Sequence, residues 1–138
     1  MSPISARPLQ PSGSMRSFLL DATLLVDVLR DVPEAVSFVR ENGEASVVSA
    51  HARALVLSAL NEETARSRAR ALLDELPCLP VTRAVADRAA DLRRSHGWSL
   101  PTSFEAAMAL ENSLTLVTRN TAEFSNGTPS FVTIPYTG

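Results

Sequence analysis

The residue of this chain best placed to do chemistry is Asp21, which directly follows the short apolar run Ser17–Leu20. An apolar run of this length between turn-forming residues is typical of a buried strand. A carboxylate at the end of such a strand can belong to a binding or catalytic site. It can also cap the next helix, because its oxygens accept backbone N–H bonds. The sequence leaves both roles open for Asp21.

Two further segments place polar residues at the end of a predicted buried strand. Ser49 and Ala50 come at the end of a run that begins at Ala45, and residues 119–123 follow the run Leu114–Thr118. In parallel sheets, ligands bind at the carboxyl ends of strands, near the point where the strand order reverses. These are therefore the positions at which the sequence predicts a site.

Helical segments separate the strands and must position the site residues. Thr82 is expected to cap one of these helices and Gly97 to end it, and Asn61 is expected to cap the helix before it. A brief extended segment is expected at residues 79–81, and a last strand at Phe131–Ile134. Apolar spacing with start and stop signals predicts helices at residues 22–30, 33–42, 51–60, 62–76, 83–95 and 101–112. This alternation is typical of a three-layer α/β/α fold with a short, mostly parallel central sheet.

Composition limits the classes of function. The chain has 138 residues, of which 45% are apolar and 20% are charged, as expected for one globular domain. Its 13 basic residues are all arginines and are outnumbered by 15 acidic residues, so nothing predicts a strongly basic face for duplex binding. The lone Cys78 excludes a disulfide framework and a cysteine-based zinc site.

The chain also lacks the signals of export or membrane insertion. No apolar run approaches the ~20 residues of a membrane span, and no charged and apolar leader opens the sequence. We therefore expect a cytoplasmic protein. Met1–Ser14 is rich in proline and serine and is predicted to be a disordered tail before a single domain at residues 15–138.

Two stretches of the sequence resemble the PIN domain family, and in particular the VapC-type toxins of toxin–antitoxin pairs. The run Phe18–Arg30 resembles the opening of these domains, and Leu116–Phe124, with its Thr-Arg-Asn triplet, resembles their closing segment. Between them, the segments His96–Pro101 and Ala106–Leu110 also fall in the family's order. The resemblance extends from Arg16 to Tyr136.

The resemblance implies a fold, an activity and partners. PIN toxins are endoribonucleases that depend on Mg²⁺ or Mn²⁺, which three or four acidic side chains hold. Such hard cations prefer oxygen ligands. VapC-type proteins also dimerise and bind an antitoxin, so the resemblance implies a homodimer, an antitoxin-like partner, and single-stranded RNA or tRNA as the substrate.

Carried over position by position, the family's acidic set is incomplete here. The first acid is present as Asp21 and the fourth as Glu123, which we expect to be the catalytic pair. Leu55 stands at the position of the second acid and Thr102 at that of the third, and neither can replace a carboxylate as a metal ligand. The resemblance also implies substrate contacts from residues near these positions: Thr23, Thr102, Arg119 and Asn120.

Glu105 could restore part of the missing charge. It lies three residues after Thr102, on nearly the same helix face, so its side chain could point toward the vacated position. The expected metal ligands are then Asp21, Glu123 and Glu105. Alternatively, residues 102–105 fit a capping box in which Glu105 bonds the Thr102 backbone N–H. The neighbouring His51 is more typical of a core or surface histidine than of a ligand.

Two functions are therefore open. The first is a VapC-like Mg²⁺-dependent ribonuclease whose activity is weak or lost, because half of the acidic set is replaced and the remainder should hold the ion weakly. The second is an inactive PIN-fold module that binds an antitoxin-like partner or RNA without cleavage.

Overall fold

The computed structural model describes residues 16–124 and 127–137. The predicted disordered tail, Met1–Ser14, lies outside the described residues. No helix of the described part is long and apolar enough to cross a membrane.

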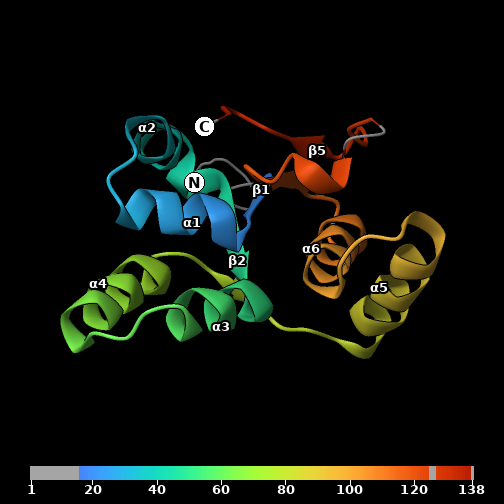
Figure 1. The fold of residues 1–138 in the computed structure, drawn as a ribbon, viewed down its shortest axis with the longest axis horizontal. Coiled ribbons are helices and arrows are strands. Elements are labelled where there is room, and N and C mark those ends of the chain that lie inside the picture. The colour runs from blue at the N-terminus through green and yellow to red at the C-terminus, as the bar shows by residue number, and fades with distance from the viewer. Residues whose placement is uncertain (1–15, 125–126, 138) are drawn as a thin grey trace.

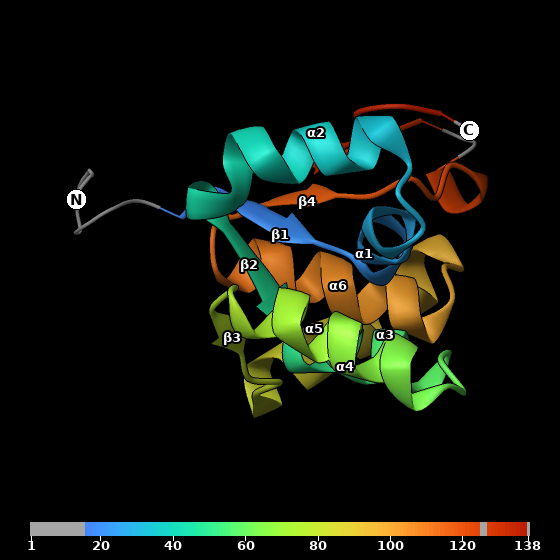
Figure 2. The same cartoon turned by 90° about the vertical axis from the view of Figure 1, so that its left-hand side faces the viewer.

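A parallel sheet of five short strands forms the centre of the molecule. Its order is β3-β2-β1-β4-β5, and every neighbouring pair is parallel. Figure 2 shows β1, β2 and β4 side by side. The strands are β1 (Phe18–Leu20), β2 (Ser46–Ser49), β3 (Cys78–Leu79), β4 (Thr115–Val117) and β5 (Val132–Thr133). The parallel sheet predicted from the alternation of strands and helices is confirmed.

In the described part of the chain, six α-helices connect the strands, close to the predicted positions. They are α1 (Ala22–Leu29), α2 (Pro33–Asn42), α3 (Ala50–Ser58), α4 (Glu63–Asp74), α5 (Arg83–His96) and α6 (Leu100–Glu111), with 3₁₀ turns η1 (Gly43–Ala45) and η2 (Ala122–Phe124). Thr82 caps α5 as predicted, and Gly97 ends it in the left-handed conformation, with φ of 72°. The predicted cap of α4 was wrong, because Glu62 and not Asn61 holds the N-cap position.

The helices cover both faces of the sheet because successive strand residues point to opposite sides. Leu19 and Leu116 pack with α5 and α6 in one apolar core. Leu20 and Val117 pack with α1, α3 and α4 in the other. Figure 1 shows the resulting halves, with α1–α4 on one side of the strands and α5 and α6 on the other. The three-layer architecture is confirmed.

The strand order reverses beside β1. The chain runs from β1 outward to β2 and β3, and then returns to place β4 on the other side of β1. The residues that follow β1 and β4, Asp21 and Thr118, therefore lie next to each other at the carboxyl edge of the sheet. In sheets of this kind the reversal leaves a crevice outside the strand ends.

We expect Leu20→Ala to lower the free energy of unfolding by about 2–5 kcal/mol, because the fully buried side chain leaves a cavity between β1 and the surrounding helices. Leu100→Ala is the matched control, since the Leu100 side chain is 44% exposed, and it should cost less than about 1 kcal/mol. Urea denaturation of both variants checks this. Equal losses would contradict the assignment of Leu20 to the core.

Candidate active site

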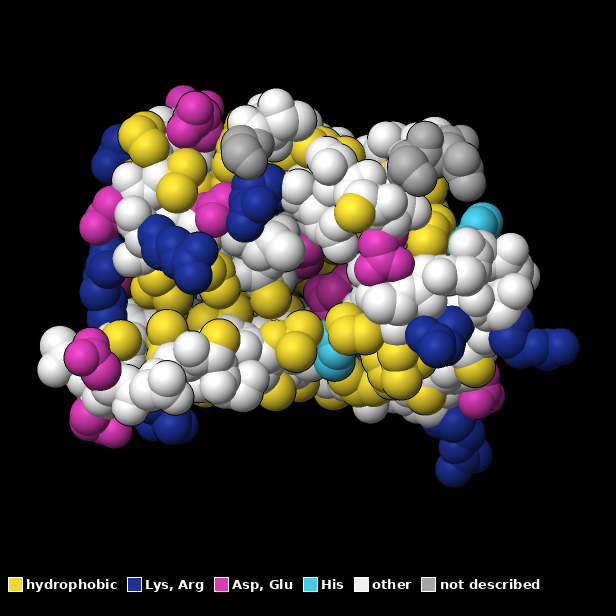
Figure 3. Space-filling model, viewed as in Figure 1, with side chains coloured by type: hydrophobic (Ala, Val, Ile, Leu, Met, Phe, Trp, Pro, Cys, Tyr) yellow, Lys and Arg dark blue, Asp and Glu magenta, His cyan; other side chains and the backbone are white. Residues whose placement is uncertain are grey.

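A pocket of about 150 Å³ lies at the carboxyl edge of the sheet, between the two halves of the molecule. Figure 3 shows acidic side chains at the bottom of a hollow there. The pocket is lined by Asp21, Ala22, Thr23, Leu55, Ser99, Pro101, Thr102, Glu105, Leu116, Thr118, Asn120, Glu123 and Phe124. The structure thus brings together all of the predicted site residues except Arg119. It also places there Leu55 and Thr102, the two positions at which the resemblance implies that family acids are replaced.

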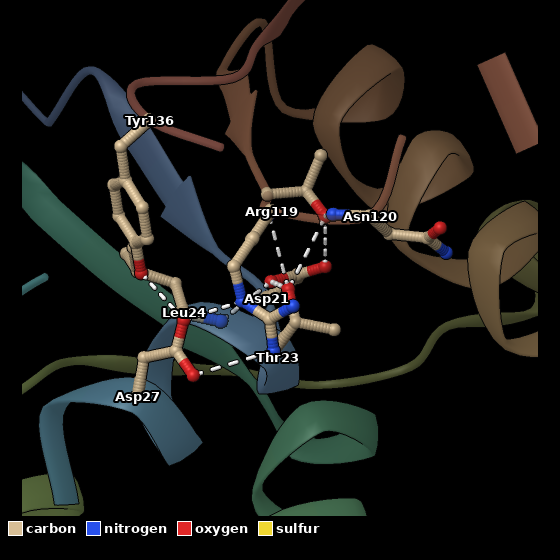
Figure 4. Close-up of polar contacts among 8 residues, drawn as sticks. Asp21, Thr23, Leu24, Asp27, Arg119, Asn120 and Tyr136 are labelled. Carbon is tan, nitrogen blue, oxygen red and sulfur yellow. Dashed lines mark hydrogen bonds and ion pairs between the residues drawn. The ribbon is translucent and has the colours of Figure 1, made fainter. Parts of the chain in front are cut away.

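Asp21 both caps α1 and lines the pocket, so the two roles left open by the sequence coexist. Its Oδ1 accepts hydrogen bonds from the Thr23 hydroxyl at 2.6 Å and the Leu24 N–H at 3.1 Å, and its Oδ2 accepts one from the Thr118 hydroxyl. Figure 4 shows this group of contacts at the start of α1. Residues from the ends of both central strands therefore fix the Asp21 carboxylate.

Burial raises the pKa of Asp21 above its ordinary value. The hydrogen bonds from Thr118, Thr23 and Leu24 favour the ionised form and oppose this effect, while the nearby negative charge of Glu105 adds to it. Burial is thus the main cause of the raised pKa, and the charge of Glu105 is the smallest contribution.

Glu123 is bound to the N-terminus of α6. Its carboxylate accepts the Ser99 N–H and the Ser99 hydroxyl, both at 2.6 Å, and the Thr102 hydroxyl at 2.8 Å. Burial acts to raise the pKa of Glu123, but the hydrogen bonds from Ser99 and Thr102 outweigh it, so the pKa lies below its ordinary value. Thr102 thus donates a hydrogen bond to Glu123.

Glu105 lines the pocket and does not form a capping box. Its Oε2 accepts the Ser49 hydroxyl at 2.7 Å and lies 2.9 Å from His51 Nδ1. The N-terminus of α6 is capped by Ser99, whose hydroxyl accepts the Thr102 N–H. The capping-box interpretation of Glu105 was therefore wrong, and so was the start of this helix, which precedes Pro101 by one residue.

Arg119 lies away from the pocket. Its guanidinium pairs with Asp27 of α1, which also accepts a hydrogen bond from the Tyr136 hydroxyl at 2.8 Å. Figure 4 shows the Arg119 and Tyr136 side chains meeting at Asp27. Arg119 thus ties the segment after β4 to α1, and its contact with a substrate stays a prediction. Asn120 lines the pocket, and its side-chain oxygen accepts the Ala122 N–H.

The residues at this pocket do not match a metal site of the family's kind. Leu55 has no ligand atom, and the Thr102 hydroxyl is already bonded to Glu123. Within residues 16–124 and 127–137, no three His, Cys, Asp or Glu side chains are grouped closely enough to hold a metal ion. The four-carboxylate arrangement that the resemblance implies is therefore not reproduced.

Sequence reasoning missed the hydroxyl side chains that hold these carboxylates. Ser99 could have been found, because a serine shortly before a proline is a common helix start. The donors Ser49 and Thr118 were noted only as strand ends. Their partners, Glu105 and Asp21, are 56 and 97 residues away in the chain, and no local pattern connects such distant residues.

We expect Glu123→Gln to lower the free energy of unfolding by about 1–2 kcal/mol at neutral pH, because it weakens charge-assisted hydrogen bonds at the start of α6. Since the folded-state pKa of Glu123 is lowered, its contribution is complete above the ordinary value of 4.5 and is lost as the pH falls through the folded-state value. The difference from the unsubstituted protein should therefore disappear in acid.

Urea denaturation at neutral and acidic pH measures this effect. Glu75→Gln, at an exposed glutamate, is the matched control and should change the unfolding free energy by less than about 0.5 kcal/mol at either pH. A Glu123→Gln effect of equal size at both pH values would show that the Glu123 charge does not contribute.

Comparison with known proteins agrees with this geometry. The PIN domain family model matches residues 18–126. No curated protein sequence matches the chain. Among solved structures, a toxin–antitoxin complex from Klebsiella pneumoniae superposes with a TM-score of 0.79 at 25% identity, over 88% of this chain and 99% of that chain.

Two further structures show the same architecture. FitAcB from Neisseria gonorrhoeae has a TM-score of 0.66 at 25% identity and covers 86% of this chain and 97% of its own. VapC20 from Mycobacterium tuberculosis, a toxin that cleaves the sarcin–ricin loop, has a TM-score of 0.67 at 13% identity and covers 82% of this chain and 97% of its own. The sequence resemblance is thereby confirmed: the chain belongs to the PIN domain family.

Proposed function

We propose that this protein is a VapC-like member of a toxin–antitoxin pair whose ribonuclease activity is weak or lost. PIN toxins use a divalent cation, and the cation offsets charge on the phosphodiester that is cut. Leu55 and Thr102 line the pocket, and the sequence resemblance places them at the positions where the family's pattern has acids. On this reading the pocket has too little negative charge to hold the ion firmly.

The hydrogen bond from Thr102 to Glu123 is the observation that supports this proposal most directly. With an acid at position 102, two carboxylates would face each other and would need a cation between them. The hydroxyl instead donates to Glu123 at 2.8 Å, and Ser99 donates to the same carboxylate. Glu123 is thus satisfied without a cation.

Restoring both missing acids tests the proposal. We expect the double variant Leu55→Glu, Thr102→Asp to cleave single-stranded RNA in Mn²⁺ or Mg²⁺ at least about tenfold faster than the unsubstituted protein, because two added carboxylates should strengthen cation binding in the pocket. The measurement is cleavage of a fluorescent RNA panel with added cation and with EDTA.

The matched control is Leu55→Gln, Thr102→Asn, which has a similar shape without the charges and should stay as slow as the unsubstituted protein. Cation-dependent cleavage by the unsubstituted protein that is as fast as that of the double variant would show that the remaining acids suffice. The proposal would then be wrong.

A second candidate function is an inactive module that binds an antitoxin-like partner. An apolar pocket of about 130 Å³ lies between α1, α3 and α4, with Val26, Leu29 and Leu60 in its walls and Arg30 and Arg68 beside it. Figure 3 shows hydrophobic side chains gathered in this half of the molecule. These features suit an amphipathic helix with acidic flanks. The antitoxin complexes among the similar structures favour such a partner; the homodimer and the RNA contact stay predictions.

We expect Leu60→Glu to weaken binding of a co-expressed antitoxin by about tenfold or more, because it places a charge in the apolar pocket. Val81→Glu is the control, since the Val81 side chain is 40% exposed and does not line this pocket. Co-purification and titration with the isolated antitoxin measure the effect. Unchanged antitoxin binding by Leu60→Glu would exclude this pocket as the docking surface.

A further inference from the structure

The turn between α5 and α6 carries an exposed ring that rests on a buried one. His96 is the last residue of α5, and its imidazole stacks on the Trp98 indole, with ring centroids 4.1 Å apart and an angle of 9° between the planes. Trp98 is buried, whereas His96 is exposed. Figure 3 shows both histidines of the chain at the surface. Trp98 thus covers one face of the His96 ring and leaves the other face open to solvent.

This aromatic stack lies beside the pocket at the carboxyl edge of the sheet. The Trp98 ring meets the Phe124 ring edge to face, with centroids 5.3 Å apart, and Phe124 lines the pocket. The residue after Trp98, Ser99, also lines the pocket and donates a hydrogen bond to Glu123. A linear polymer that enters the pocket can therefore place a neighbouring unit on the open face of His96.

Two arginines flank the stack. Arg93 and Arg94 lie with His96 in the last turn of α5, and both are exposed. The Arg93 guanidinium donates a hydrogen bond to the Trp98 carbonyl at 3.3 Å. Within residues 16–124 and 127–137, neither arginine forms an ion pair. Both positive charges are therefore free to meet an anionic ligand.

Charge at the end of a helix does not by itself explain this arrangement. A cation in the last turn complements the helix dipole, and Arg93 and Arg94 already supply that charge. The dipole requires no particular ring, and it does not require the ring to lie parallel to Trp98. The stack holds a flat surface in a fixed orientation, which is what a second flat ring needs for stacking.

We propose that His96 is a stacking platform for one base of a single-stranded RNA, with Arg93 and Arg94 contacting the adjoining phosphates. Unpaired bases stack on aromatic and histidine side chains, and nearby basic side chains follow the backbone. Such a site needs no strongly basic face, in agreement with the excess of acidic residues in the chain. The proposal rests on the proposed function in taking RNA as the ligand. The contact lies outside the carboxylate pocket and requires neither a cation nor cleavage.

Binding of fluorescein-labelled oligoadenylate tenmers to the full-length protein in EDTA tests the proposal, because EDTA prevents cation-dependent cleavage. Fluorescence anisotropy gives the dissociation constants. We expect His96→Ala and His96→Lys to weaken binding by about fivefold or more, because both remove the ring. His96→Phe, which keeps a flat ring, should stay within about twofold of the unsubstituted protein. An abasic tenmer, with phosphates but no bases, should bind His96→Ala and the unsubstituted protein equally.

Two further measurements locate the contact. Trp98 is the only tryptophan of the chain, so its emission should change as oligoadenylate saturates the protein. Arg94→Gln should weaken binding of both tenmers by about threefold and lower the salt dependence, because a phosphate contact is lost. Arg88→Gln is the matched control on the same helix, because Arg88 is paired with Glu111, and it should change the affinity by less than about twofold.

Equal oligoadenylate affinities of His96→Ala and the unsubstituted protein would overturn the proposal, as would an absence of RNA binding or an unchanged Trp98 emission. If thermal unfolding shows that His96→Ala does not fold, the comparison of His96→Lys with His96→Phe decides in the same way. Loss of antitoxin co-purification in His96→Ala with unchanged RNA binding would assign the stack to a protein partner and overturn the proposal. Rapid cation-dependent cleavage by the unsubstituted protein would contradict the proposed function but not this contact, so the two failures are distinguishable.

Discussion

The structure of this pocket depends on holding three carboxylates close together without a basic side chain in the pocket wall. Like charges in a partly buried site repel one another, and each needs donors or a counter-ion. No arginine or histidine is among the described residues that line the pocket. Hydroxyl groups of Thr23, Ser49, Ser99, Thr102 and Thr118 donate hydrogen bonds to these carboxylates. His51 Nδ1 also lies 2.9 Å from Glu105 Oε2, although His51 is not among the lining residues.

This arrangement explains how the fold can persist while the site changes. The two apolar cores are formed by strand and helix residues on either face of the sheet, and none of the pocket acids belongs to them. Two of the three acids instead act at helix starts, where Asp21 caps α1 and Glu123 bonds the beginning of α6. Replacing a metal ligand with a hydroxyl therefore removes charge repulsion and leaves the scaffold intact.

The sequence predicted the scaffold well because its signals are local. Apolar strands, the Thr82 cap and the Gly97 stop each act within a few residues, and all were confirmed. The capping-box interpretation of Glu105 failed because a capping box is a local pattern. The actual partners of Glu105, Ser49 and His51, are 56 and 54 residues away in the chain. Which donors hold each carboxylate depends on such distant contacts, so only the structure could reveal them.

The central claim is that hydrogen bonds from Ser99 and Thr102 satisfy Glu123 without a cation. Anomalous diffraction from crystals of the protein soaked in MnCl₂ tests it most directly. Our account predicts that Glu123 stays bonded to Ser99 and Thr102 and that no strong manganese peak lies in the pocket. Manganese coordinated by Glu123, with its hydrogen bonds to Ser99 and Thr102 broken, would contradict the account. The hydrogen bonds from Ser99 and Thr102 would then form only in the metal-free protein.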